Sequence, residues 1–227
     1  MSLSHLDTGT GEHALPVEFT VVRHGQTGEN VRGILQGWLN TPLDERGVRQ
    51  SHAVAESLRD ETFDRLVSSD LQRALESAAP LGERLGLPVE KMSVLREWHL
   101  GDLEGRPVRE LQREYPEIMG AFLRDTAEEI DVPGGETHEA FFVRIAACLD
   151  ALARENPGCK LLLVTHGGVL RAIYRHVVGF VSSGRLIPQT GNACICRFCY
   201  RNGEWQLTCW NDLSHLKSVG YRESLTF

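Results

Sequence analysis

The sequence has no apolar run long enough to cross a membrane, which takes about 18 uncharged residues or more. Residues 1–16 lack the basic start and apolar stretch of a secretory signal, so we expect a flexible lead-in, a cytoplasmic location and no membrane partner. Basic residues are also the minority, with 24 Lys and Arg against 31 Asp and Glu, a net charge of −7. Nucleic-acid-binding proteins typically carry a basic face, so no nucleic-acid partner is predicted.

Metal-binding patterns are missing as well. The nine histidines form neither HExxH nor a compact HxH, so a metal hydrolase built on His24 and His166 is the weakest enzyme hypothesis. Six cysteines are present, but structural zinc usually needs two CxxC-like pairs. Cys194, Cys196 and Cys199 instead alternate in a strand-like run, which favours buried thiols over zinc ligands or disulfides. We therefore predict no metal and no other cofactor.

What the sequence does contain is an alternation of strand-like and helix-like segments. Strands are expected at 18–22, 65–68, 89–95, 160–165, 193–200 and 204–210, the last two as a hairpin around Asn202-Gly203. Helices are expected at 44–59, 71–85, 106–124 with a break near Pro116, a segment capped by Thr137, and 168–178. This order predicts a three-layer α/β/α sandwich with a mostly parallel central sheet. We expect one domain, residues 17–227, with an insertion at about 96–136 over one end of the sheet.

Two of the predicted strands end in a His-Gly turn, Arg23-His24-Gly25 and Thr165-His166-Gly167. Ligands of open α/β sheets bind beyond the carboxyl ends of the strands. A guanidinium fork suits phosphate or carboxylate, a neutral imidazole can attack phosphorus, and the N-terminus of a following helix favours an anion. Each turn taken alone could be an ordinary surface turn or a histidine at a helix start. Two such turns at one sheet edge favour a site.

Two further residues suit the same chemistry. Arg73 falls in the first turn of a helix that leaves a strand, where a cation is slightly unfavourable unless an anion is bound. Glu97 precedes Trp98, and a carboxyl group in such surroundings can serve as a general acid. A solvated glutamate is the simpler interpretation of that position.

Four blocks of the sequence resemble, in order, those of the histidine phosphatase superfamily, branch 1, which has the phosphoglycerate mutase-like fold. These blocks are residues 23–27 (RHGQT), 68–74 (SSDLQRA), 133–137 (PGGET) and 164–168 (VTHGG). The similarity extends from about Val17 to Trp210, nearly the whole chain. It implies a helical insertion over the active site and a branch that includes cofactor-dependent mutases and small phosphatases.

The resemblance also implies roles for individual residues. His24 would be the nucleophile that becomes a phosphohistidine, with Arg23, Arg73 and His166 completing the phosphate pocket. Glu97 would be the general acid that protonates the leaving oxygen. Further substrate contacts are implied for Asn30, Gln36, Gly37, the backbone N–H of Gly167, and Asn192. Phosphoryl transfer depends on positioning and charge stabilisation, which these arginines and imidazoles can supply without a metal.

Within the family, the sequence favours a phosphomonoesterase over a mutase. The segment after Glu97 leads within a few residues into a helix, and only 69 positions separate Glu97 from His166. The resemblance implies a longer segment at this place in a mutase. Gln26-Thr27 after the first His-Gly turn is also more similar to phosphatases. The alternatives are a phosphoglycerate mutase-type phosphotransferase and a catalytically silent module that binds a phosphorylated ligand, although a silent relative has no need of the full residue set.

The substrate is expected to be a small phosphorylated metabolite, and a homodimer is left open. Arginines in the insertion could recognise a second acidic group, although a solvated helix face is the simpler interpretation; these are Arg106, Arg109, Arg113 and Arg124. His99 and His138 are expected at the surface or the rim of the site, and His52 and His176 are expected to be structural.

Overall fold

The computed structural model of the chain describes residues 15–124, 131–179 and 188–219. The expected lead-in therefore lies, apart from Leu15 and Pro16, outside the described residues. Among the described residues, no helix combines the length and the hydropathy that a membrane span requires. The six cysteines are all free, and Cys194 and Cys196 are buried.

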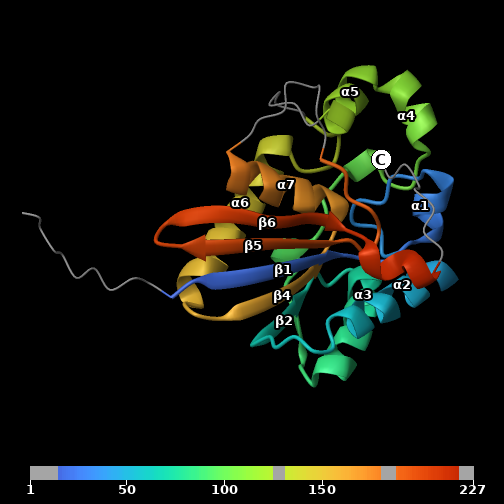
Figure 1. Cartoon of the computed structure of the whole chain (residues 1–227). Helices are drawn as coiled ribbons and strands as arrows, with labels where there is room; N and C mark the ends of the chain where they lie inside the picture. Colours follow the sequence, from blue (N-terminus) through green and yellow to red (C-terminus); the bar gives the residue numbers. More distant parts are fainter. Residues whose placement is uncertain (1–14, 125–130, 180–187, 220–227) are drawn as a thin grey trace, which may run out of the picture.

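Six strands form one sheet in the order β3-β2-β4-β1-β5-β6 (Figure 1). Their bounds are β1 Val17–Arg23, β2 Arg65–Ser68, β3 Val89–Lys91, β4 Lys160–Thr165, β5 Ile195–Arg201 and β6 Glu204–Asp212. Strands β3, β2, β4 and β1 are parallel to one another, whereas β5 and β6 form an antiparallel hairpin beside β1. The prediction of a mostly parallel sheet with a terminal hairpin is confirmed.

Helices cover both faces of the sheet (Figure 1). Their bounds are α1 Gly28–Arg32, α2 Glu45–Ser57, α3 Gln72–Leu85, α4 Val108–Glu114, α5 Pro116–Arg124, α6 His138–Glu155 and α7 Gly167–Val178. Side chains of β4 alternate between two apolar clusters: Leu161 and Leu163 pack with α6 and α7, whereas Leu162 and Val164 pack with α2 and α3. Because successive side chains of a strand point to opposite faces, this uninterrupted apolar run supplies both interfaces of the three-layer sandwich.

Local sequence explains most of the element boundaries. Thr137 caps α6 by accepting a hydrogen bond from the N–H of Ala140, and Gly86 ends α3 in the left-handed conformation. Pro116 starts α5, where its missing N–H costs nothing, so the expected helical segment is two helices. Strand β3 is shorter than expected because its partner β2 ends at Ser68, and a 3₁₀ turn at Ser93–Leu95 follows.

The carboxyl ends of β1 and β4 lie side by side and bring the two His-Gly turns together. Arg23 is opposite Thr165 in the parallel register, and the N–H of His24 donates to the carbonyl of Thr165 at 2.8 Å. The α4–α5 pair of the insertion stands at this end of the sheet beside α1 (Figure 1). Backbone hydrogen bonds from Leu35 to Arg106 and from Val108 to Gly33 join the insertion to the segment after α1.

Candidate active site

His24 lies at the end of β1 with only 2% of its surface exposed. Its Nδ1 is 2.7 Å from the carbonyl oxygen of Gly25, and because a carbonyl only accepts, Nδ1 carries the proton. The lone pair is therefore on Nε2. The turn itself is tightly packed, since a Cβ on Gly25 would lie 2.5 Å from the carbonyl oxygen of Gly47. Backbone packing and one hydrogen bond thus fix the orientation and tautomer of this imidazole.

His166, at the end of β4, places its ring centre 5.3 Å from that of His24. Its Nε2 is 2.8 Å from the Oγ of Ser69, which follows β2. Its Nδ1 is fully buried and has no hydrogen-bond partner among the described residues. Residues from the ends of three parallel strands therefore meet at one point.

Two buried guanidinium groups lie beside these imidazoles. Arg23 donates through Nη1 to the carbonyl of Thr190, and Arg73 donates through Nη1 and Nη2 to the carbonyls of Leu39 and Gly37, at 2.8 Å each. The Nε atoms of both arginines are buried and unpaired in the part of the chain that the structure describes. Buried donors are nearly always satisfied in proteins, so unpaired donors of this kind identify a place for an acceptor.

Burial decides the charge state of the site. It lowers the pKa of His24 well below the ordinary value, and the guanidinium groups of Arg73 and Arg23 lower it further. Burial also lowers the pKa of His166 well below the ordinary value, and the neighbouring Arg73 and His24 lower it further. Burial also lowers the pKa of Arg73 to about 10, which still leaves this group charged at neutral pH. The site thus combines neutral imidazoles with a buried cation, an arrangement suited to a dianion and a nitrogen nucleophile.

Glu97 reaches the same pocket from the segment before the insertion. Its Oε1 accepts from the N–H of Trp98 and its Oε2 from the N–H of Gly168, both at 3.0 Å. A Cβ on Gly168 would lie 2.2 Å from Oε1, so this glycine lets the carboxyl group lie against the first turn of α7. The carboxyl group is thereby fixed at the pocket wall, where it can exchange a proton with a bound molecule.

The structure gathers most of the sequence-predicted site residues in one pocket. Those that line it are Arg23, His24, Asn30, Gln36, Gly37, Arg73, Glu97 and Gly167. The Oδ1 of Asn30 accepts from the N–H of Thr27, and the Oε1 of Gln36 accepts from two threonine hydroxyls. The amide oxygens of Asn30 and Gln36 thus accept hydrogen bonds from the protein. Their amide N–H groups are the donors that can bind an anion.

Asn192 lies behind this pocket, not in its lining. It is buried, and its Nδ2 donates to the Oδ1 of Asn30 at 3.0 Å and to the carbonyl of His24 at 3.3 Å. The structure therefore gives Asn192 a place that supports the His24 turn. His166 is also absent from the lining and fully buried, although its ring neighbours that of His24.

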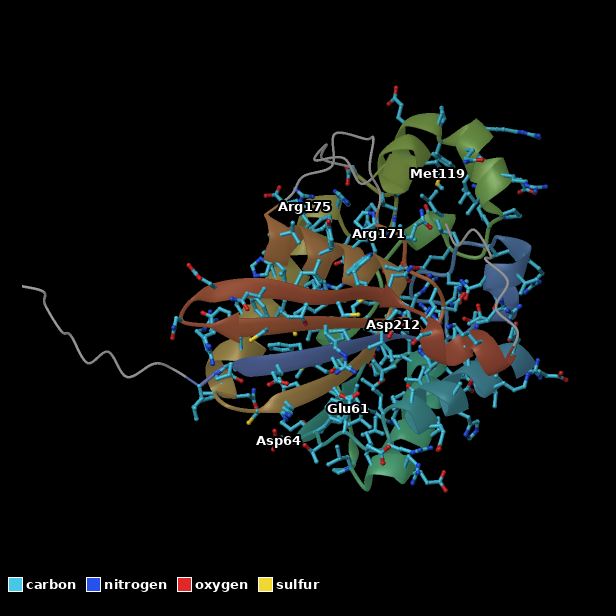
Figure 2. The ribbon with its side chains drawn as sticks, in the orientation of Figure 1. Glu61, Asp64, Met119, Arg171, Arg175 and Asp212 are labelled. Carbon is cyan, nitrogen blue, oxygen red and sulfur yellow. The ribbon has the colours of Figure 1, made fainter. Side chains whose placement is uncertain are left out.

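Several pocket residues escaped sequence analysis. Glu29, Thr190 and Arg171 contribute polar groups, and an apolar wall comes from Ile34, Leu35, Leu100 and Val108. Arg171 lies on the side of α7 that faces the α4–α5 pair (Figure 2). Its spacing of four residues from Gly167 was the available signal, because residues i and i+4 share a helix face. The other polar residues depend on how α1 and a distant loop pack.

Other sequence expectations need correction or completion. His138 is not at the surface: it is 5% exposed and packs against Trp98 and Phe142. Arg106 pairs with Glu114 on the exposed side of the insertion, and Arg106, Arg109 and Arg113 are not among the pocket-lining residues. The side chain of Arg124 lies outside the described residues. In the described part of the chain, no cluster of three His, Cys, Asp or Glu residues suits a metal ion.

Comparison with known proteins agrees with the fold and with the order of the sequence blocks. A family model described as the histidine phosphatase superfamily (branch 1) matches residues 19–213. The chain is 35% identical to a metal-independent phosphoserine phosphatase of Arabidopsis thaliana, covering 90% of this chain and 85% of that protein. It is 33% identical to phosphoglycerate mutase-like protein 4 of the same plant, covering 99% and 96%.

Solved structures give the same result. A mycobacterial glucosyl-3-phosphoglycerate phosphatase aligns with a TM-score of 0.78 at 31% identity, covering 86% of this chain and 99% of that one. The shared architecture confirms the predicted phosphoglycerate mutase-like fold, and the matched range includes every motif that carries the pocket. The chain belongs to the histidine phosphatase superfamily, branch 1.

Proposed function

We propose that the protein is a metal-independent phosphomonoesterase that acts through a phosphohistidine on His24. One observation carries this proposal: two buried, unpaired N–H groups lie beside a neutral imidazole. They are the Nε–H groups of Arg23 and Arg73. A phosphate dianion offers several strong acceptors, so it would satisfy these donors and balance the arginine charge.

In the first step, Nε2 of His24 attacks phosphorus and the bond between phosphorus and the ester oxygen breaks. Glu97, in its acid form, gives its proton to that oxygen, and the alcohol leaves neutral. The products are a phosphohistidine and the Glu97 carboxylate. The hydrogen bond from Nδ1 of His24 to the carbonyl of Gly25 holds the ring during attack. Removing one electrostatic contact from such a site typically costs about 10²–10³-fold in rate.

In the second step, water attacks the phosphohistidine. The Glu97 carboxylate accepts a proton from this water, the P–N bond breaks, and its electron pair returns to Nε2 of His24. Inorganic phosphate leaves, and Glu97 regains its acid form. Each residue thus returns to its starting state, which is the requirement for turnover.

The pocket supports a small substrate. His24 is too deeply buried to meet a phosphate on a flat protein surface, so the ester must enter the pocket. The apolar wall of Leu100 and Val108, together with the charges of Glu29 and Arg171, suits a short organic group that carries polar substituents. The relatives named for phosphoserine and glucosyl-3-phosphoglycerate support this substrate class.

A cytoplasmic location is part of the proposal, and the six free cysteines agree with a reducing compartment.

The proposal is tested by hydrolysis of p-nitrophenyl phosphate with and without EDTA, in the wild-type protein and in His24→Ala. We expect turnover that EDTA leaves unchanged and that His24→Ala abolishes. His52→Ala is the matched control, because His52 is exposed on α2 and not among the pocket-lining residues. An acid-labile phosphoryl group on the wild-type protein, missing from His24→Ala, would identify the intermediate.

The same assay separates the alternatives. Loss of activity in EDTA would refute the proposed mechanism in favour of a metal hydrolase. Phosphate binding without turnover on any of a panel of monoesters would favour a silent binding module. Interconversion of phosphoglycerates faster than their hydrolysis would favour a mutase. The same panel, with O-phosphoserine, phosphoglycerates and sugar phosphates, then ranks substrates by kcat/KM.

A further inference from the structure

One side chain from α6 holds the segment that carries Glu97. The guanidinium of Arg144 donates through Nη1 to the carbonyls of Val94 and Arg96, at 2.6 and 3.1 Å, and through Nη2 to the carbonyl of Glu97 at 3.2 Å. Three carbonyls within four residues thus converge on one cation. A planar fork with five N–H groups can satisfy several acceptors at fixed angles, which a lysine ammonium cannot do with the same geometry.

The same guanidinium forms a paired contact with Glu136. Nε of Arg144 donates to Oε2 at 3.1 Å, and Nη2 donates to Oε1 at 2.5 Å. Oε1 of Glu136 also accepts from the N–H of His99 at 2.9 Å. The side chains of Arg144 and Glu136 are only 20% and 18% exposed, so water competes weakly with these contacts. The pair therefore forms hydrogen bonds with the backbone before Glu97, at Val94 and Arg96, and after it, at His99.

The turn that supplies Glu136 is itself docked against the residues after Glu97. The N–H of Asp102 donates to the carbonyl of Pro133 at 2.9 Å, and the N–H of Glu136 donates to the carbonyl of His99 at 3.0 Å. A Cβ on Gly135 would lie 2.5 Å from that carbonyl oxygen. Glycine is needed here because the two backbones are in direct contact. The Pro-Gly-Gly-Glu block thus lies against the Glu97 segment and not in the pocket lining.

We propose that Arg144, paired with Glu136, is the positioning unit for Glu97 and sets the efficiency of proton transfer to the leaving oxygen. This inference rests on the phosphatase function proposed above. Arg144 does not line the pocket, so its effect passes through the backbone of residues 94–97. The Nε1 of Trp38 also donates to the carbonyl of Glu97, at 2.7 Å. Loss of Arg144 therefore loosens Glu97 without releasing it completely.

The dependence on leaving group distinguishes positioning from a general loss of structure. An alkyl alcohol needs a proton to leave, whereas p-nitrophenolate leaves readily without one. For Arg144→Ala we expect kcat/KM on an alkyl monoester to fall about 10²-fold, the cost of a misplacement of about 1 Å. The loss on p-nitrophenyl phosphate should be at least about tenfold smaller, because general acid catalysis contributes little there. Arg144→Lys should fail to restore activity, and Glu136→Gln should show the same pattern more weakly.

Arg197→Ala is the matched control. Arg197 also forms a two-point contact with a carboxylate, at 2.8 and 2.7 Å to Glu61, and a third bond to Thr20. Glu61 lies on the side of the sheet away from the insertion (Figure 2). Arg197→Ala should lower the melting temperature without any leaving-group preference. If Arg144→Ala does not fold, Arg144→Lys and Glu136→Gln carry the same comparison.

A double-mutant cycle completes the test. In a Glu97→Gln background, Arg144→Ala should cause no further loss of kcat/KM on the alkyl monoester, because both changes remove the same proton transfer. Equal losses on the two esters, or full additivity with Glu97→Gln, would overturn the positioning role. Failure of the wild-type protein to hydrolyse any monoester, or full activity of His24→Ala, would instead refute the proposed function. The two failures are therefore distinguishable.

Discussion

Gly168→Ala tests the position of Glu97 by adding a single carbon atom. The new Cβ would lie 2.2 Å from Oε1 of Glu97 and 3.1 Å from its Cδ. Favourable contacts between heavy atoms begin at about 3.5 Å, so the carboxyl oxygen must move by about 1 Å. It is the end of a flexible side chain, and this movement costs the fold little. The same movement takes the acid away from the leaving oxygen.

Gly168→Ala should affect stability and activity differently. Alanine is favoured over glycine in a helix interior by up to about 1 kcal/mol, and less in the first turn, so the melting temperature should stay unchanged or rise slightly. A misplacement of about 1 Å can cost about 10²-fold in rate. That loss corresponds to about 2.7 kcal/mol of transition-state stabilisation. The variant should therefore be stable and slow.

The assay compares kcat/KM on an alkyl monoester and on p-nitrophenyl phosphate with the melting temperature of each variant. Gly28→Ala is the control, because it also adds a methyl group at a helix start but meets only the end of Arg32, at 3.9 Å. Unchanged kcat/KM on the alkyl monoester in a folded Gly168→Ala protein would refute the role of Glu97 as the acid. An equal loss on both esters would show that the phosphate site, not the acid, was disturbed.

Three further predictions address charge, packing and pH. Arg73→Lys should lower kcat/KM about 10²–10³-fold, because an ammonium cannot reproduce the guanidinium bonds; steady-state kinetics with intact circular dichroism checks this. Gly25→Ala should lower the free energy of unfolding by about 1–3 kcal/mol in urea titrations, since its Cβ would meet the backbone of Gly47. The lowered pKa values of His24 and His166 mean that the unfolded chain binds more protons below about pH 6.5, so stability should fall as the pH drops through that range. The double variant His24→Asn/His166→Asn should lose less stability over the same range, and an identical decline would contradict this assignment.

Much of the fold followed from local patterns because each was strong by itself. The short apolar run of β4 indicates a buried strand, and Thr137, Pro116 and Gly86 set helix ends through simple backbone chemistry. Helix α1 was missed because five residues are too short for a periodic pattern. Its capping box between Thr27 and Asn30 was the available signal.

Some residues of the site were likewise predictable from local patterns, whereas others were placed only by tertiary packing. His24 and His166 were predictable because each follows a strand directly, and parallel strands end at one edge of a sheet. Asn192 was predicted as a substrate contact. That its Nδ2 also donates to the carbonyl of His24 was decided by the packing of the loop before β5. His138 was predicted near the surface, yet the side chain packs under Trp98 once α6 docks.

The sequence alone determined the residue types of the site, their order along the chain and the architecture that brings them to one edge. Those properties depend on short-range chemistry and on strand direction, which local patterns report. Only the tertiary structure decided which donors are buried without a partner, which tautomer His24 adopts, and that Arg144 holds the Glu97 segment from α6. These features arise from contacts between residues far apart in the chain, because burial and hydrogen bonding are set by what finally surrounds each group.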